Sequence, residues 1–279
     1  MKSEPGAHPE PPPDFYSRTL PIATHGGSLF RTHLHTAAPL YFGRTGRNRF
    51  DDPKGRYGVL YAARDLFGAF VETFGQETGN RTVGVGELKM RRLTEFCPAT
   101  PLSLVDLCGQ GCLARIGADG RLFAANRAIA RRWSRAIYEH PDRLKLHGIL
   151  YPARHNHTRS AVALFDREAA LPRLEVNRTV SWYSPEGDMR STLAAILDLY
   201  GFNVVETEMR PDKKRPGSLY SMSSCAGRPD GSPNRFQWAE RPDIRFAGRD
   251  FDGASCPSTY AEHYVRLMAS FREVAASLC

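Results

Sequence analysis

The 279-residue sequence lacks the features that mark several large classes of protein. No stretch approaches the roughly 18 consecutive apolar residues that a membrane-spanning helix needs. Residues 1–14 are rich in proline and contain no apolar run of the kind found in a secretory signal. From these absences we expect a soluble, cytoplasmic protein that makes no use of a membrane.

Cysteine is also scarce, and the common catalytic motifs are missing. The six cysteines are too few for a disulfide scaffold, and Cys108 and Cys112 lack both the spacing and the second pair of a zinc knuckle. The sequence contains no GxxxxGK[ST], GxSxG or HExxH motif, and GVGEL is too short for a dinucleotide fingerprint. The histidines are isolated, so we expect no metal site and no prosthetic group.

The composition is that of a globular protein, with 41% hydrophobic and 24% charged residues. The net charge is +8, and residues 110–160 contribute much of it, with ten basic and three acidic side chains, or +7. Such a field attracts a phosphate-bearing ligand, a nucleic acid or an acidic protein partner. The alternative is that the basic side chains of residues 110–160 form only a solvated helix face.

Periodicity predicts a mixture of strands and helices. Alternating residues predict a strand over 28–36, with Phe30 and Leu34 buried and Arg31 on the opposite face. Further strands are predicted over 59–63 and 82–89, and a strand, turn and strand over 147–166.

After Ala63, apolar residues recur at helical spacing, and Asp65 suits the start of this predicted helix. A second amphipathic helix is predicted over 120–138, with its arginines on a different face from Trp133. A third is predicted over 189–200, closed by Gly201.

The two ends differ in character from the middle. Residues 1–27 are predicted to be an extended or disordered lead-in, and residues 206–279 a loop-rich extension that ends in a helix over about 258–278. The predicted domain between them spans residues 28–205.

Within this domain, a strand arginine, an arginine–phenylalanine pair, a strand-end tyrosine and a helix glutamate follow one another within 42 positions. The ordered motifs FRTH, GRNRF, GVLYAA and AFVETF, with the later GILYPARHN and SAVALF, resemble the RES domain, the toxin half of bacterial toxin–antitoxin pairs. The resemblance implies an α+β fold similar to ADP-ribosyltransferases, with a mixed-sheet core and flanking helices. It also implies an enzyme that acts on NAD, with inorganic phosphate as one acceptor and protein as another.

The resemblance also implies the residues of the site. Arg31, Glu72 and Tyr61 would be catalytic, with Glu72 stabilising the positive charge that develops on the ribose as nicotinamide leaves. The substrate would be bound by Arg49, Phe50, Tyr41 and Ala153. His33 is a further substrate-binding candidate, because it is two positions from Arg31 and therefore on the same strand face.

One position departs from the family pattern. The serine that gives the family its last letter is replaced by Ala153, in YPAR. The alanine removes a hydroxyl that could hydrogen-bond the ligand, a loss on the order of 1 kcal/mol.

Several alternatives stay open. The leading hypothesis is phosphorolysis of NAD to nicotinamide and ADP-ribose 1″-phosphate. A second is ADP-ribose transfer to a protein, and a third is a non-catalytic module that binds nucleic acid through residues 110–160, which is poorly supported because few aromatic residues lie among the arginines. We further expect an antitoxin that covers the pocket, and leave open self-association into a homo-oligomer.

Overall fold

The computed structural model describes residues 10–76, 79, 81–124, 127–167, 171–206, 209–211 and 219–221. The chain divides into two compact units, Met1–Gly227 and Arg228–Cys279. The described residues all belong to the first unit. The helix predicted over about 258–278 lies outside them.

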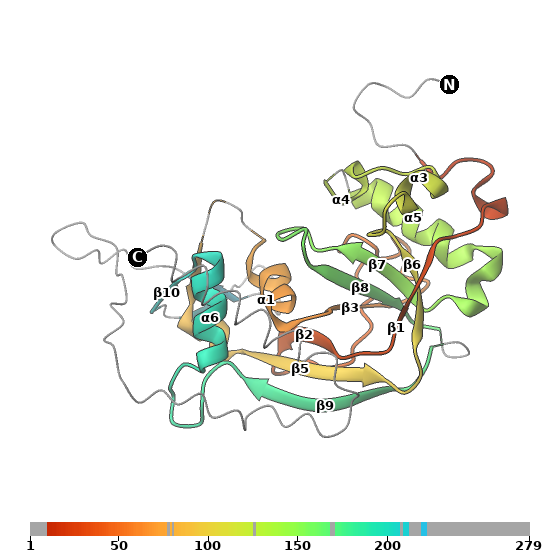
Figure 1. Cartoon of the computed structure of the whole chain (residues 1–279). Coiled ribbons are helices and arrows are strands. Elements are labelled where there is room, and N and C mark those ends of the chain that lie inside the picture. Colours follow the sequence, from red (N-terminus) through yellow and green to blue (C-terminus); the bar gives the residue numbers. More distant parts are fainter. Residues whose placement is uncertain are drawn as a thin grey trace, which may run out of the picture. The chain divides into compact units, whose positions relative to one another are not determined.

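An eight-stranded mixed sheet forms the centre of the first unit (Figure 1). Neighbouring strands are antiparallel except β6 and β7, which are parallel. In spatial order the strands are β1 (Ile22–His25), β6 (Leu102–Asp106), β7 (Gly148–Pro152), β8 (Ser160–Phe165), β3 (Val59–Ala63), β2 (Leu29–Leu34), β5 (Arg91–Pro98) and β9 (Leu174–Ser181).

The sheet curls, so that one of its faces packs against itself. Strands β5 and β6 are consecutive in the chain but five strands apart in the sheet. Even so, Phe96 of β5 and Leu102 of β6 belong to one buried cluster with side chains from β2, β3, β7 and β8. This apolar interior is built almost entirely from strands.

Two helices cover the opposite face near β2 and β3. Helix α1 (Leu66–Phe74) begins at Asp65, whose carboxylate accepts the N–H of Gly68, as the sequence predicts. Helix α6 (Ser191–Tyr200) ends at Gly201, which adopts the left-handed conformation at φ 64°. The two helices share a core that includes Phe70 and Trp182.

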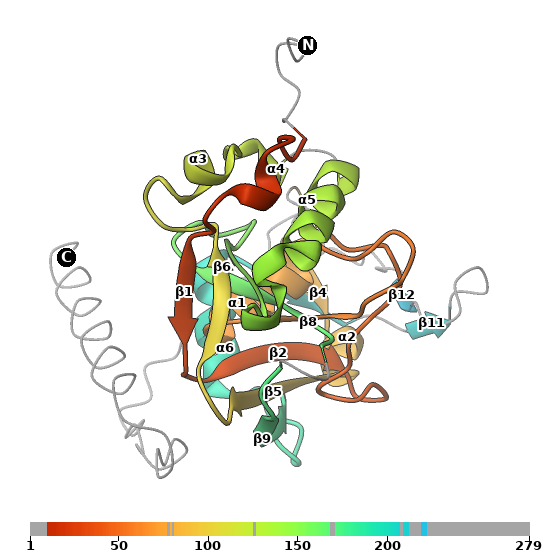
Figure 2. The ribbon, with the colours of Figure 1, turned by 90° about the vertical axis from the view of Figure 1, so that its right-hand side faces the viewer.

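A second group of helices lies over the other half of that face (Figure 2). It consists of α3 (Cys112–Ile116), α4 (Arg121–Ala124) and α5 (Arg127–Glu139), with the short 3₁₀ turns η1 (Phe15–Ser17) and η2 (Pro141–Lys145). Trp133 and Ile137 of α5 are fully buried against the sheet, which is the apolar face predicted from their spacing.

The remaining elements are small. Strands β4 (Thr82–Gly84) and β10 (Asn203–Val205) pair in parallel, and β11 (Met209–Pro211) pairs with β12 (Leu219–Ser221). Helix α2 (Val85–Lys89) follows β4 directly. No helix among the described residues is both long enough and apolar enough to cross a bilayer.

The predicted α+β class, with a mixed sheet and flanking helices, is confirmed. Four local predictions are wrong. Residues 15–25 of the predicted lead-in belong to the fold, because Phe15 is fully buried in the core and β1 pairs with β6. The strand predicted over 82–89 stops at Gly84, because Val85 and Leu88 point to the core at helical spacing. Leu34 is half-buried, whereas Leu29 and Phe30 are both buried, because both faces of β2 are covered. Part of the extension predicted as loop forms the β11–β12 ladder.

Candidate active site

Two neighbouring interior strands of the sheet, β2 and β3, diverge and open a cavity. Strands β2 and β3 are joined at the single residue pair Phe30–Ala63, whereas β2 and β5 are paired at six positions. A cavity of about 290 Å³ lies at this fork. Residues 30–32 of β2 and residues 61–63 of β3 form its floor.

Four segments of the chain make the walls of the cavity. They are helix α1 with the turn after it, the loop before β3, residues 151–161 from the end of β7 to the start of β8, and the region where α4 and α5 meet. The residues that they contribute are Asn48, Arg49, Ala69, Glu72, Thr73, Gln76, Phe123, Arg127, Tyr151, Pro152, Arg154, His155 and Ala161. The lining residues are therefore spread over positions 30 to 161 of the sequence.

The lining is strongly positive. It includes four arginines, at positions 31, 49, 127 and 154, and a single carboxylate, Glu72. Four positive charges and one negative charge give a formal charge of +3. A concave site with this charge binds anions, and guanidinium groups match the oxygens of phosphate in pairs.

Glu72 projects from α1 toward the turn between β7 and β8. Its Oε1 accepts the main-chain N–H of Arg154 at 2.7 Å, and a main-chain bond from His155 also reaches the carboxylate. Burial raises the pKa of Glu72, although these bonds and the charges of Arg154 and Arg49 act in the opposite direction. The carboxylate is thus held in place by hydrogen bonds, while burial disfavours its ionised form.

Arg49 reaches the cavity from the loop before β3. Its Nη1 donates to the carbonyl oxygen of Leu122 at 3.1 Å. Burial, followed by the charges of Arg154 and Arg127, lowers the pKa of Arg49. Because an arginine stays protonated in proteins, this crowding of like charges favours the arrival of an anion rather than loss of a proton.

Arg31 lies on the floor of the same cavity and is anchored at one end. Its Nη1 donates to the carbonyl oxygens of Pro39 and Tyr41, each at 2.9 Å. Burial lowers the pKa of Arg31. The ring of Tyr41 is 53% exposed and is not part of the lining, so Tyr41 contributes to the site through its carbonyl.

Tyr61 and Phe50 support the cavity in different ways. Tyr61 lines it, but its hydroxyl donates to Asp51 at 3.0 Å and accepts the N–H of Phe50 at 2.9 Å. Phe50 is fully buried and packs edge to face against Tyr151, with ring centroids 4.9 Å apart. Phe50 therefore packs behind the lining residue Tyr151 and does not itself line the cavity.

His33 and Ala153 are buried outside the lining. The His33 Nε2 is 2.8 Å from the hydroxyl of Thr94, and its Nδ1 is 2.8 Å from the carbonyl of Leu34. Ala153 has no exposed surface, and its N–H donates to the carbonyl of Arg159. The structure thus brings together Arg31, Arg49, Tyr61 and Glu72 of the predicted residues, and not His33, Phe50, Tyr41 or Ala153.

The lining residues that sequence reasoning missed include Arg127, Tyr151 and Arg154. Tyr151 and Arg154 flank the position of the family serine, in the YPAR segment, and that closeness was the available signal. Arg127 belongs to the arginine face predicted for 120–138. Its position in the cavity depends on a contact across 80 residues, from its Nη1 to the carbonyl of Arg47.

Most basic residues of the stretch 110–160 make hydrogen bonds or ion pairs with other groups of the same chain. Arg127 and Arg131 donate to loop carbonyls, and five other basic residues form ion pairs. These pairs are Arg121–Asp119, Arg132–Glu10, Arg135–Glu139, Lys145–Asp142 and Arg159–Asp65. The nucleic-acid alternative gains no support from this arrangement. Among the residues that the structure describes, no group of three His, Cys, Asp or Glu side chains could hold a metal ion.

Comparisons with known proteins relate this chain to one family and to individual proteins. The model of the RES domain family matches residues 28–184, which is more than half of the chain. The protein "Probable toxin y4kH" of Sinorhizobium fredii is 35% identical over 128 residues, which cover 46% of this chain and 93% of that protein. A toxin–antitoxin complex of M. tuberculosis, MbcT–MbcA, contains a chain that is 16% identical with a TM-score of 0.48, over 64% of this chain and 92% of that one.

Proposed function

Because this chain belongs to the RES domain family, we propose that it is a toxin that binds NAD at the β2–β3 fork and cleaves the nicotinamide–ribose bond. The name of the Sinorhizobium relative, a probable toxin, supports the toxin assignment. The observation that carries the proposal is the cavity lining itself, in which one carboxylate faces four arginines. This composition suits a dinucleotide with a negatively charged pyrophosphate and a bond whose cleavage develops positive charge.

The reaction divides the work between the two kinds of charge. As the bond between the ribose carbon and nicotinamide breaks, its electron pair moves to the nicotinamide nitrogen and leaves positive charge on the sugar. A carboxylate beside the sugar stabilises this charge in the transition state more than in the ground state, which raises the rate. Glu72 is the carboxylate among the lining residues, and the Arg154 N–H fixes its position.

The arginines bind the anionic parts of the reactants. Arg49 and Arg31 pair with the pyrophosphate, and the rings of Tyr61 and Tyr151 provide apolar surface for the nucleoside. None of these roles requires a metal ion.

Inorganic phosphate is the proposed acceptor. The formal charge of the lining is +3, so the two negative charges of a pyrophosphate leave an excess of +1. Arg127 and Arg154, which are not assigned to the pyrophosphate, are the groups available to the phosphate. A phosphate oxygen forms the new bond to the ribose carbon and gives up its proton to solvent. The products are nicotinamide and ADP-ribose 1″-phosphate.

The test is incubation of the purified full chain with NAD, with and without phosphate, followed by measurement of nicotinamide and of the sugar phosphate. We expect nicotinamide release that depends on phosphate and is lost in Glu72→Gln. Release that does not respond to phosphate, with label from NAD carried to a protein, would instead indicate ADP-ribose transfer. No NAD consumption under any of these conditions would refute the enzyme.

We also propose that an antitoxin protein covers the cavity and silences the toxin. An acidic or polar segment suits a partner for this opening, because the lining is positive. Co-purification of the chain with the product of a neighbouring reading frame, with loss of NAD cleavage in the complex, would bear this out. A partner that binds tightly and leaves the turnover unchanged would count against it.

A further inference from the structure

A second carboxylate near the cavity is buried without a charged partner. Asp51 is 1% exposed, and its partners in the described part of the chain are neutral. Its Oδ2 accepts from the hydroxyl of Thr45, the N–H groups of Arg47 and Asn48, and the side-chain amide of Asn48, at 3.0–3.2 Å. Its Oδ1 accepts the hydroxyl of Tyr61 at 3.0 Å. A buried charge is tolerated only with such full hydrogen bonding, so this loop is built around the carboxylate.

The residue before Arg49 is fixed at both of its main-chain groups. The N–H of Asn48 donates to Asp51 at 3.0 Å. The carbonyl of Asn48 accepts from Nε of Arg131, on helix α5, at 3.0 Å. The main chain on the N-terminal side of Arg49 is therefore held by two contacts, one within the loop and one from helix α5.

The residue after Arg49 is fixed in the same way. The N–H of Phe50 donates to the hydroxyl of Tyr61 at 2.9 Å, and the carbonyl of Phe50 accepts from the hydroxyl of Ser134 at 2.7 Å. Tyr61 in turn donates to Asp51, so one hydroxyl links strand β3 to both the carboxylate and the main chain. Burial raises the pKa of Tyr61 well above its ordinary value, which keeps this hydroxyl protonated and able to donate.

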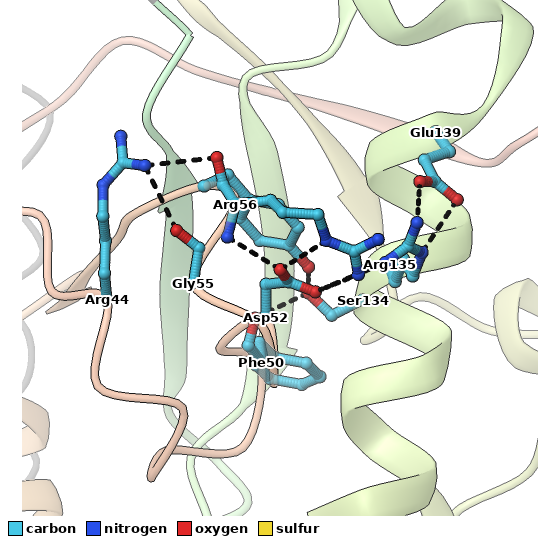
Figure 3. A network of polar contacts seen from close by, with 9 residues as sticks. Arg44, Phe50, Asp52, Gly55, Arg56, Ser134, Arg135 and Glu139 are labelled. Atoms are coloured by element: carbon cyan, nitrogen blue, oxygen red, sulfur yellow. Dashed lines mark hydrogen bonds and ion pairs between the residues drawn. The ribbon is translucent and has the colours of Figure 1, made fainter.

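The return of the loop is fastened to α5 by a separate network (Figure 3). The fully buried carboxylate of Asp52 accepts from the main chain and the guanidinium of Arg56 at 2.6–2.8 Å. Nη1 of Arg135 lies 3.7 Å from the same carboxylate, and Arg135 also pairs with Glu139. These contacts hold the far end of the loop, whereas the hydrogen bonds of Asp51 are made to residues 45–48 at its tip and to Tyr61.

We propose that Asp51 is a positioning residue that acts through Arg49, setting the guanidinium in the cavity before the anionic ligand arrives. This inference rests on the proposed function, since it assigns Arg49 to an anionic ligand. It also gives the Tyr61 hydroxyl a role in holding the loop, through Asp51 and Phe50. A preorganised arginine loses less entropy on binding than one on a loose loop, so the effect is on ligand affinity.

The experiment compares Asp51→Asn and Asp51→Ala with the wild-type full chain in calorimetric titrations with NAD. The asparagine keeps one oxygen for the loop donors but places an amide against Tyr61. We expect NAD affinity to fall about tenfold in Asp51→Asn, the size of one lost charge-assisted contact, and further in Asp51→Ala. Asp142→Asn, a matched change at an exposed ion pair, serves as the control and should bind as the wild type does.

A double-mutant cycle separates positioning from general stability. In an Arg49→Ala background, Asp51→Asn should cause no further loss, because the residue through which it acts is gone. Tyr61→Phe, which removes the same link without burying a new group, should show the same dependence on Arg49. A tenfold loss that persists in the Arg49→Ala background, or unchanged affinity in Asp51→Asn, would overturn the inference.

A second probe keeps this result distinct from the proposed function. If the wild-type chain binds inorganic pyrophosphate but not NAD, the proposed function fails and the same cycle with pyrophosphate decides the role of Asp51. If the chain binds neither probe, both proposals fall.

Discussion

The main-chain N–H of Arg154 donates a 2.7 Å hydrogen bond to Oε1 of Glu72, and so joins the turn after β7 to helix α1. The contact ties a side chain of the proposed chemistry to a segment 82 residues away. It also places the guanidinium of Arg154 and the carboxylate of Glu72 in the lining of one cavity. The arrangement of this pair allows their contributions to be measured separately.

Replacement of Glu72 by glutamine should abolish NAD cleavage without disturbing the fold. The glutamine oxygen still accepts the Arg154 N–H, so the turn keeps its anchor, but the negative charge is lost. We expect nicotinamide release to fall by a factor of about 10² or more, as when a preorganised group of this kind is removed elsewhere. The circular dichroism spectrum should stay the same. A variant with more than a tenth of wild-type turnover would contradict the role given to Glu72.

The raised pKa of Glu72 predicts a pH-dependent difference in stability between wild type and Glu72→Gln. Burial makes the folded protein bind this proton more tightly than the unfolded chain does. Glu72 therefore contributes stability that is complete below its unfolded pKa, about 4.3, and is lost as the pH rises through the higher folded value. In urea unfolding between pH 4 and pH 7, the variant should gain in free energy of unfolding relative to wild type as pH rises. A constant difference would show that the carboxylate is not penalised by burial.

Removal of the Arg154 side chain should weaken ligand binding while the anchor to Glu72 stays in place, since that bond comes from the main chain. We expect Arg154→Ala to bind NAD about tenfold more weakly, because an anion loses a charge-assisted hydrogen bond, and to need more phosphate for half-maximal rate. Arg143→Ala removes an equal charge from outside the cavity lining and is the control. Equal losses in the two variants would mean that only the long-range field matters.

A serine restored at position 153 should not restore a ligand contact. The side chain of Ala153 is fully buried and lies outside the cavity lining, so the hydroxyl of Ala153→Ser must find an internal acceptor. We expect an unchanged rate of nicotinamide release and a loss of about 1 kcal/mol in the free energy of unfolding. The two quantities are measured by product assay and urea denaturation. A tenfold gain in rate would show that the alanine limits this enzyme.

The local elements of the site could be predicted from sequence because their signals lie within a few residues. The cap at Asp65, the apolar spacing of α1 and the alternation along β2 each reflect burial of one face, which is a local property. Strands β5, β6 and β9 were not predicted. Strand β9 lies at the edge of the sheet, and all of its residues are exposed or half-buried. Its sequence therefore lacks the alternation of apolar and polar residues that predicts a strand.

The amino-acid sequence by itself determined the kinds of elements, the excess of positive charge and the order of the motifs that resemble the RES domain. Only the tertiary structure decided that β2 and β3 part after one residue pair, and that α5 holds the loop of Arg49 by contacts across more than 80 residues. Periodicity specifies which face of an element is buried, but the partner of that face is chosen by packing over the whole chain. For this reason Arg127 and Arg154 entered the cavity, and His33 was placed outside it.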